Sequence, residues 1–437
     1  MKQFNKTRSL NNNSINFKSL MFMVYIILLI PTCRFVTEFQ NSFYLFEYTL
    51  LFALPALKTL LLDVKFRKVV FKYSTALMFF YIIYFTTFYY KEGKIFSGYL
   101  NSFIFIFHII IISYFLYENE FFFKNSLVLV FNILSIFFVF IPHYKYTNSL
   151  TLGNFYNLLD EVGIFNGTLE APSIVAICLL LNFFVLKNTN KKKWFYSICI
   201  LFSIFQLLLF SRRGLIFSSL ISIIYVYIVS RNKFKISVYW QGVLIFVPFL
   251  WNILSPALVI MQEMGFFSIF TTRNDLDEIK TATGRLIAWQ EIISLILSFD
   301  SKYILGYWGE LPQNWFLNTE DGSRYAHAHN TFLQLFVEGG YMSLILLSII
   351  ILKCISNIKK MVSLKIISMC YSPILFTFFL TISGTESLLR GISFLNFFFI
   401  IIYLSLCFEV EYFERSFIDK TEYKKKYVDY KYDFIRE

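Results

Sequence analysis

The sequence predicts an all-α polytopic membrane protein with about 12 transmembrane helices and one large, partly helical outer loop. Of its 437 residues, 57% are hydrophobic and only 16% are charged, whereas soluble domains are about 45–50% apolar and about a quarter charged. Apolar runs close to the roughly 20 residues that cross a bilayer recur along the whole chain. Lysine and arginine are concentrated in alternate connections between these runs. We therefore expect a single membrane domain.

Each candidate span is an apolar run bounded by charged or polar residues. In chain order the spans cover 19–36, 43–63, 70–90, 98–117, 125–141, 171–186, 194–210, 214–230, 236–256, 331–352, 366–383 and 391–409.

The distribution of positive charge predicts the orientation. With a cytoplasmic N-terminus, the predicted inner segments hold 28 of the 40 lysines and arginines, as the positive-inside rule requires. Only the acidic inner loop 117–124 departs from this pattern. Both termini are then cytoplasmic. The net charge of +12 is explained mainly by orientation, which argues against nucleic-acid binding.

The chain divides into five parts by this threading. We expect a cytoplasmic N-terminus at 1–18, helices one to nine at 19–256, a large outer loop at 257–330, helices ten to twelve at 331–409, and a cytoplasmic tail at 410–437. The stretch "TGRLIAWQEIISLILSF" in the outer loop has helical periodicity and should fold over the membrane face. The charged stretch at 419–437 is typical of a solvated, disordered end.

The six cysteines show no spacing typical of disulfides or metal ligands. They lie in or beside apolar segments, which is typical of small core residues.

The arginines that fall on the predicted outer side include Arg212, Arg213, Arg285 and Arg324. Arg212 and Arg213 occupy a tight turn, where two guanidiniums need an anion or carboxylate to offset their desolvation. The planar guanidinium suits phosphate oxygens. The alternative is an interfacial anchor whose charged groups reach the headgroups.

Two of the four histidines, His327 and His329, immediately precede the tenth span. His329 is either a capping residue or a general base, because neutral imidazole accepts protons near pH 7. A metal site is disfavoured, because no third ligand stands close in sequence.

The tenth span contains Glu338, Gly339 and Gly340. An intramembrane acid is a candidate functional residue, and small residues let another helix or a lipid approach the backbone. The aromatic residues Trp289, Tyr307 and Trp308 offer flat faces for sugar rings, or belong to the core or the interface belt.

These motifs together resemble the O-antigen polymerase and O-antigen ligase family. His329 and Asn330 match its His-Asn pair, Gly340 follows after nine residues, and Ser343 stands where a second glycine is usual. "SRRG" (211–214) is similar to the family's outer Ser-Arg turn, and "TGRLIAWQ" (283–290) to its Gly-Arg-x-x-x-Trp stretch. "ILGYWGE" (304–310) resembles the glycine-rich segment that follows.

The resemblance implies a cofactor-free, metal-independent, inverting glycosyltransferase resembling the C-type membrane class. Its donor would be an undecaprenyl-diphosphate-linked oligosaccharide, and its active site would face the periplasm of a bacterial inner membrane. His329 would deprotonate the acceptor hydroxyl, and Arg212 and Arg285 would hold the diphosphate, with Arg213 as the alternative in the turn. Asn330, Glu338 and Gly340 would support the site. Membrane lipids, a chain-length regulator and a flippase would be its partners.

Three activities remain open from the sequence. A polymerase joins lipid-linked repeat units, and we favour it because richness in Phe, Ile, Asn and Lys suits a divergent surface-polysaccharide locus. A ligase would instead transfer the finished glycan to lipid A-core. A flippase or transporter would need charged residues along a path through several spans. Here most of the candidate polar residues lie at the predicted outer face of the membrane.

Overall fold

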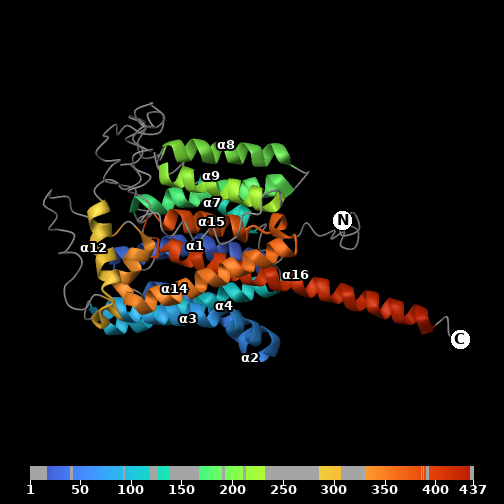
Figure 1. The fold of residues 1–437 in the computed structure, drawn as a ribbon, viewed down its shortest axis with the longest axis horizontal. Helices are drawn as coiled ribbons and strands as arrows, with labels where there is room; N and C mark the ends of the chain where they lie inside the picture. Colours follow the sequence, from blue (N-terminus) through green and yellow to red (C-terminus); the bar gives the residue numbers. More distant parts are fainter. Residues whose placement is uncertain are drawn as a thin grey trace.

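The computed structural model shows a bundle of long helices with one helix lying across one end (Figure 1). The regular elements among the described residues are α-helices and short 3-10 helices, and no strand occurs among them. The structure describes residues 17–39, 43–91, 94–118, 126–136, 167–188, 192–209, 213–231, 285–306, 328, 330–384, 386, 388–389 and 393–433.

The long helices run side by side in Figure 1, whereas α12 crosses their direction. The helices are α1 Phe17–Phe39, α2 Phe43–Leu62, α3 Val64–Lys91, α4 Ile95–Glu118, α7 Gly167–Asn188, α8 Lys193–Leu209, α9 Arg213–Arg231, α12 Arg285–Leu297, η2 Ser301–Tyr303, α14 Thr331–Ser363, η3 Ile367–Met369, α15 Ser372–Ser383 and α16 Phe394–Asp433; a further short helix covers Ser126–Ile136.

Six of the described helices are long and apolar enough to cross a membrane, in α2, α3, α4, α7, α14 and α16. Five further apolar helices are shorter: Lys18–Leu29, Ser126–Ile136, Lys193–Leu208, Gly214–Val229 and Ser372–Ser383. Eleven of the predicted spans coincide at least in part with these helices. The ninth, 236–256, lies outside the described residues, so the total of 12 stays a prediction.

The C-terminal helix α16 forms the centre of the bundle. It packs against α1, α3, α4, α14 and α15, and 94% of an 18-residue apolar window within its stretch Phe394–Glu414 is buried inside the protein. A helix that is apolar on all sides is covered either by lipid or by protein, and for this stretch the cover is mostly protein. The remaining helices divide around it, with α3 and α4 on one side and α7, α8 and α9 on the other (Figure 1).

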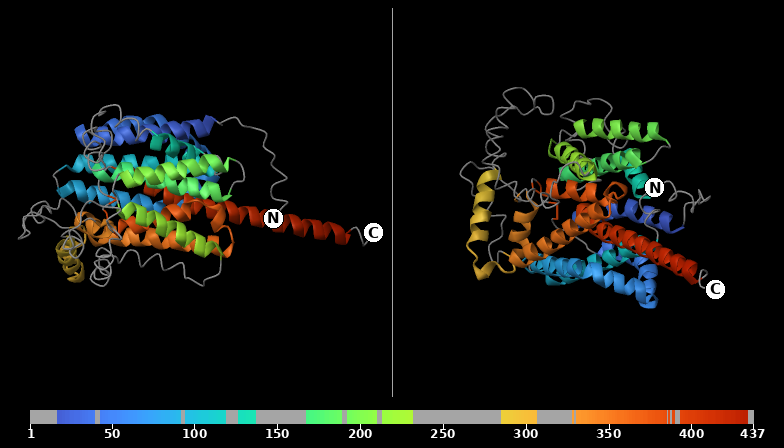
Figure 2. Two further views of the ribbon diagram at one scale, coloured as in Figure 1. Left: turned by 90° about the horizontal axis from the view of Figure 1, so that it is seen from above. Right: turned by 45° about the vertical axis from the view of Figure 1, so that its right-hand side comes forward.

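The prediction of a disordered end at 419–437 is wrong for residues 419–433. The helix α16 continues to Asp433 and projects from the bundle at the end opposite α12 (Figures 1 and 2). Residues 410–433 contain no glycine or proline. A helix already formed in the core can be extended through such residues without a new nucleation step.

Several polar side chains inside the bundle bond to one another across helices. His108 on α4 bonds through Nδ1 to the hydroxyl of Tyr25 at 2.5 Å and through Nε2 to the hydroxyl of Thr49 at 2.9 Å. The Asn182 amide on α7 donates to Asn132 Oδ1 at 2.7 Å. Because an unpaired polar group in an apolar interior is costly, these pairs fix the contacts between helices.

Gly340 interrupts the regular geometry of α14 within an apolar run. Its φ of 66° and ψ of −163° belong to a region that essentially only glycine adopts. A Cβ there would lie 2.1 Å from the Gly306 nitrogen and 2.3 Å from the Tyr303 carbonyl oxygen. The amide of Met342 donates to the carbonyl of Ile304 at 3.1 Å. The small residues predicted to admit a helix or lipid therefore admit the loop that follows α12.

We predict that Gly340→Ala destabilises the protein by about 2–6 kcal/mol, because backbone strain and overpacking each cost about 1–3 kcal/mol. Thermal unfolding in detergent measures the effect. The matched control is Ser343→Ala, because the Ser343 hydroxyl is buried without a hydrogen-bond partner among the described residues. Its removal should leave the midpoint unchanged or raise it. Equal midpoints for both variants would contradict the role given to Gly340.

Candidate active site

The structure describes some of the predicted site residues in full, some in their backbone only, and others not at all. His327, His329, Arg212 and Arg324 lie outside the described residues, as do Tyr307 and Trp308. Arg213 and Arg285 are described in their backbone as the first residues of α9 and α12. Asn330, Glu338 and Gly340 are described in full.

Asn330 begins α14 and joins it to the connection between α15 and α16. Its extended backbone (φ −155°, ψ 127°) is typical of an N-cap, and its Oδ1 accepts the amide of Leu333 at 2.9 Å. Its Nδ2 donates to the carbonyl of Gly384 at 2.9 Å. Asn330 is completely buried, so the residue that follows His329 has a fixed position.

Thr331 strengthens the same connection. Its hydroxyl donates to the carbonyl of Glu386 at 2.7 Å and accepts the amide of Leu388 at 2.9 Å. Three hydrogen bonds therefore hold the chain between α15 and α16 against the start of α14.

The residue that precedes His329 is held from two sides. The indole N–H of Trp289 on α12 donates to the carbonyl of Ala328 at 2.7 Å, and the amide of Ala328 donates to Gln334 Oε1 at 2.7 Å. Trp289 is only 1% exposed. It packs in a small apolar cluster with Ile292, Tyr303, Ala328, Leu333, Phe336 and Val337.

This burial decides between the interpretations of Trp289. The ring belongs to the core beneath α12 and is not an exposed platform for a sugar. Its indole nitrogen serves to position the backbone beside residue 329.

Glu338 connects this arrangement to α3. The Gln334 Nε2 donates to Glu338 Oε1 at 2.7 Å, and the Tyr84 hydroxyl donates to Glu338 Oε2 at 2.6 Å. The carboxylate thereby orients the Gln334 amide, so that its oxygen faces Ala328. Glu338 is 6% exposed, and its role in the described structure is to support the start of α14.

The sequence pointed to Asn330 and Glu338, but Gln334 was missed. An i, i+4 pair of polar residues, Gln334 and Glu338, inside an apolar run was the pattern that could have found it. Thr331 and the connection 384–388 gave no comparable pattern, because their contacts join segments more than 50 residues apart.

The described helices and this buried network define a polytopic membrane protein with a polar site at one end of its bundle. The sequence model of the O-antigen ligase family matches residues 197–348, from α8 into α14. The match covers about a third of the chain and includes α9, α12 and Asn330. Over this segment the chain is similar to the O-antigen ligase family, which covers ligases and polymerases. No curated protein and no solved structure matches the chain.

We predict that Gln334→Leu and Trp289→Phe each destabilise the protein, because each leaves a buried backbone group of Ala328 without this partner. The cost of such a group is about 1–3 kcal/mol. Gln334→Leu should cost more, since it also removes a donor from Glu338. The measurement is thermal unfolding in detergent.

The matched control is Gln290→Leu, because Gln290 neighbours Trp289 on α12 but is exposed. Its unfolding midpoint should stay near that of the unaltered protein. An equal loss in all three variants would show that the hydrogen bonds to Ala328 are not what stabilises this region.

Proposed function

We propose that the chain is an O-antigen polymerase, joining undecaprenyl-diphosphate-linked repeat units outside a bacterial plasma membrane. His329 is the general base in this proposal. The main support is that Ala328 and Asn330, on either side of it, are both fixed by buried hydrogen bonds. A general base must stand within hydrogen-bond reach of one hydroxyl, and a fixed backbone limits where its side chain can go.

Two arginines of the proposal stand at helix N-termini. Arg285 is the first residue of α12 and Arg213 the first residue of α9, and Arg212 directly precedes Arg213 in the sequence. Unpaired amides and the helix dipole make such ends favourable for anions. A guanidinium at the same place adds a full positive charge and a planar pair of donors. This combination suits the diphosphate of a lipid-linked glycan.

The proposed reaction is a displacement at the anomeric carbon of the donor glycan. The acceptor hydroxyl attacks as His329 removes its proton, and the bond to the diphosphate breaks with inversion. The guanidiniums stabilise the charge that develops on the departing diphosphate. Imidazole and guanidinium groups can supply both functions, so the proposal assigns no step to a metal.

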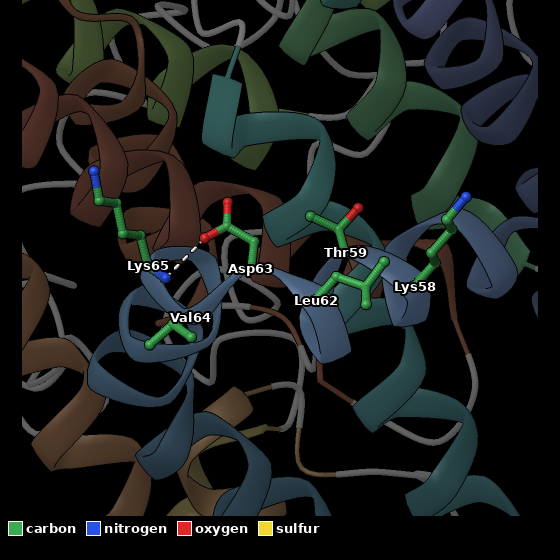
Figure 3. A pocket seen from close by; sticks show the side chains of 6 residues that line it. All are labelled: Lys58, Thr59, Leu62, Asp63, Val64 and Lys65. Carbon is green, nitrogen blue, oxygen red and sulfur yellow. Dashed lines mark hydrogen bonds between the residues drawn. The ribbon is translucent and has the colours of Figure 1, made fainter.

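The location of basic residues supports an outward-facing site. The turn between α2 and α3 lies at the end of the bundle away from α12 (Figure 1). A surface pocket there is lined by Lys58, Thr59, Leu62, Asp63, Val64 and Lys65 (Figure 3). Asp63 caps α3 by accepting the amides of Lys65 and Phe66 at 2.7 and 3.1 Å. Because positive loops stay in the cytoplasm, the α12 end would face outward.

An O-antigen ligase is the second candidate, because the matching family model carries that description. It would use the same base and the same diphosphate contacts, with lipid A-core as the acceptor. The two activities therefore differ in the acceptor and not in the residues named above.

We predict that a deletion strain carrying His329→Ala makes no long surface polysaccharide, whereas the unaltered chain restores it. Electrophoresis of the lipopolysaccharide measures this. Core with a single repeat unit in the variant indicates a polymerase, and bare core with accumulating lipid-linked polymer indicates a ligase. A normal ladder from a well-expressed His329→Ala protein would refute the proposed base.

We also predict that Arg212→Ala and Arg285→Ala each lower the transfer rate by about 10²–10³-fold, as expected for a lost donor to developing charge. The rate is measured on purified protein with a lipid-linked oligosaccharide. Lys302→Ala is the control, because Lys302 is an exposed cation paired with Asp300, and its rate should be unchanged. Equal rates in the arginine and lysine variants would contradict the diphosphate site.

A further inference from the structure

The chain after α12 presents large apolar side chains outward. Leu297 is 64% exposed, Phe299 77%, Ile304 46% and Leu305 37%. These four residues, here called the 297–305 patch, lie where α12 adjoins α14 at one end of the bundle (Figure 1). Contiguous exposed apolar groups mark a surface that is covered by a partner or by lipid.

The patch lies below the outermost turns of the bundle. Its loop docks on the kink of α14, where Met342 N–H bonds to Ile304. About one turn before Met342 on α14, Glu338 accepts from Tyr84 of α3. Tyr84 lies seven residues before the end of α3 at Lys91, which is about 10 Å at 1.5 Å per residue. The patch therefore lies at the depth of the membrane interface and not above it.

The patch continues a row of lipid-facing side chains on α14. The ring of Phe299 stacks on Tyr341 with centroids 6.2 Å apart and planes 5° apart, and the Tyr341 hydroxyl donates to the carbonyl of Ile296 at 2.8 Å. From Tyr341 the row runs down α14 through the exposed residues Ile345, Ile349 and Leu352, spaced for one face of a helix. The surface that meets lipid on α14 thus extends without a break onto Phe299.

The backbone conformation at Phe299 is one that a bulky residue rarely adopts. Its φ is +49°, at the end of α12 where glycine is the usual residue. A bulky residue is strained in this conformation. In water, a ring that is mostly exposed would gain little to offset that strain, whereas in lipid the same ring is transferred to an apolar environment.

Charged groups border the patch at the level of headgroups. Lys302 Nζ lies 3.0 Å from Asp300 Oδ2. The hydrogen bond from the amide of Lys302 lowers the pKa of Asp300, which keeps the carboxylate ionised. Apolar residues beside paired charges are typical of a segment at the boundary between headgroups and acyl chains.

We propose that the 297–305 patch inserts among the acyl chains of the membrane leaflet nearer α12. Phe299, Ile304 and Leu305 enter the lipid, and Asp300 and Lys302 remain among the headgroups. The inserted turn anchors the C-terminal end of α12, and the other end of the helix stays free of the bilayer core. This proposal does not depend on the proposed enzymatic function.

The test is the accessibility of nitroxide labels on the protein in phospholipid nanodiscs. Single cysteines replace Phe299, Ile304 and Leu305 in a parent in which Cys33 and Cys199 are changed to serine. The remaining described cysteines are buried, and the parent gives the background. Power saturation then compares collisions with oxygen, which partitions into lipid, and with a nickel chelate, which stays in water.

Ser294→Cys on the exposed polar face of α12 is the water control, and Ile349→Cys on α14 is the lipid control. We expect oxygen accessibility to exceed nickel accessibility at 299, 304 and 305, as at 349, with the reverse at 294. Higher nickel accessibility at the patch would overturn the proposal. Protection from both reagents would also overturn it, because it would show that protein, such as a second copy of this chain, covers the patch. The three cysteine variants are tested separately, so if one of them misfolds, the other two still decide the outcome.

Discussion

The arrangement at the α12 end of the bundle depends on a backbone contact at Gly340 that leaves no space for a Cβ. The contact lets the loop after α12 reach the main chain of α14, where the amide of Met342 holds Ile304. With that loop fixed, α12 is fixed, and Trp289 reaches the carbonyl of Ala328. The position of the chain beside residue 329 thus follows from the absence of one carbon atom eleven residues later.

The second support for the same segment comes from inside the bundle. Tyr84, Glu338 and Gln334 form a continuous series of hydrogen bonds from α3 to the amide of Ala328. In an apolar interior such a series is stable only when every member has a partner. The carbonyl of Ala328 is therefore held by packing of α12, and its amide is held by polar contacts inside the bundle. A change in either set of contacts should alter the position of Ala328.

The sequence predicted elements whose cause is local and missed those whose cause is tertiary. Apolar length located eleven helices of the described chain, six of them long enough to cross a membrane, and periodicity located α12 within a long loop. The end at 419–437 was wrongly predicted to be disordered, because polarity indicates contact with water, whereas the helicity of this end follows from extension of α16. The glycines at 339–340 indicated a close approach, but nothing in the sequence identified Ile304 as the partner. For the site, Asn330 was found through its motif. Gln334 was missed, because only its spacing from Glu338 is visible in the sequence and its contact with the amide of Ala328 is not.

The central position of α16 has a consequence for how the protein is made. It is the last of the described helices in the chain, yet it packs against α1, α3, α4, α14 and α15, and its part from Phe394 to Val410 is almost completely buried. Because a ribosome delivers the N-terminal helices first, these helices enter the bilayer before the element that they surround has been synthesised. Until then, the faces that will contact α16 meet lipid or one another. In this protein, assembly ends with the core instead of beginning with it.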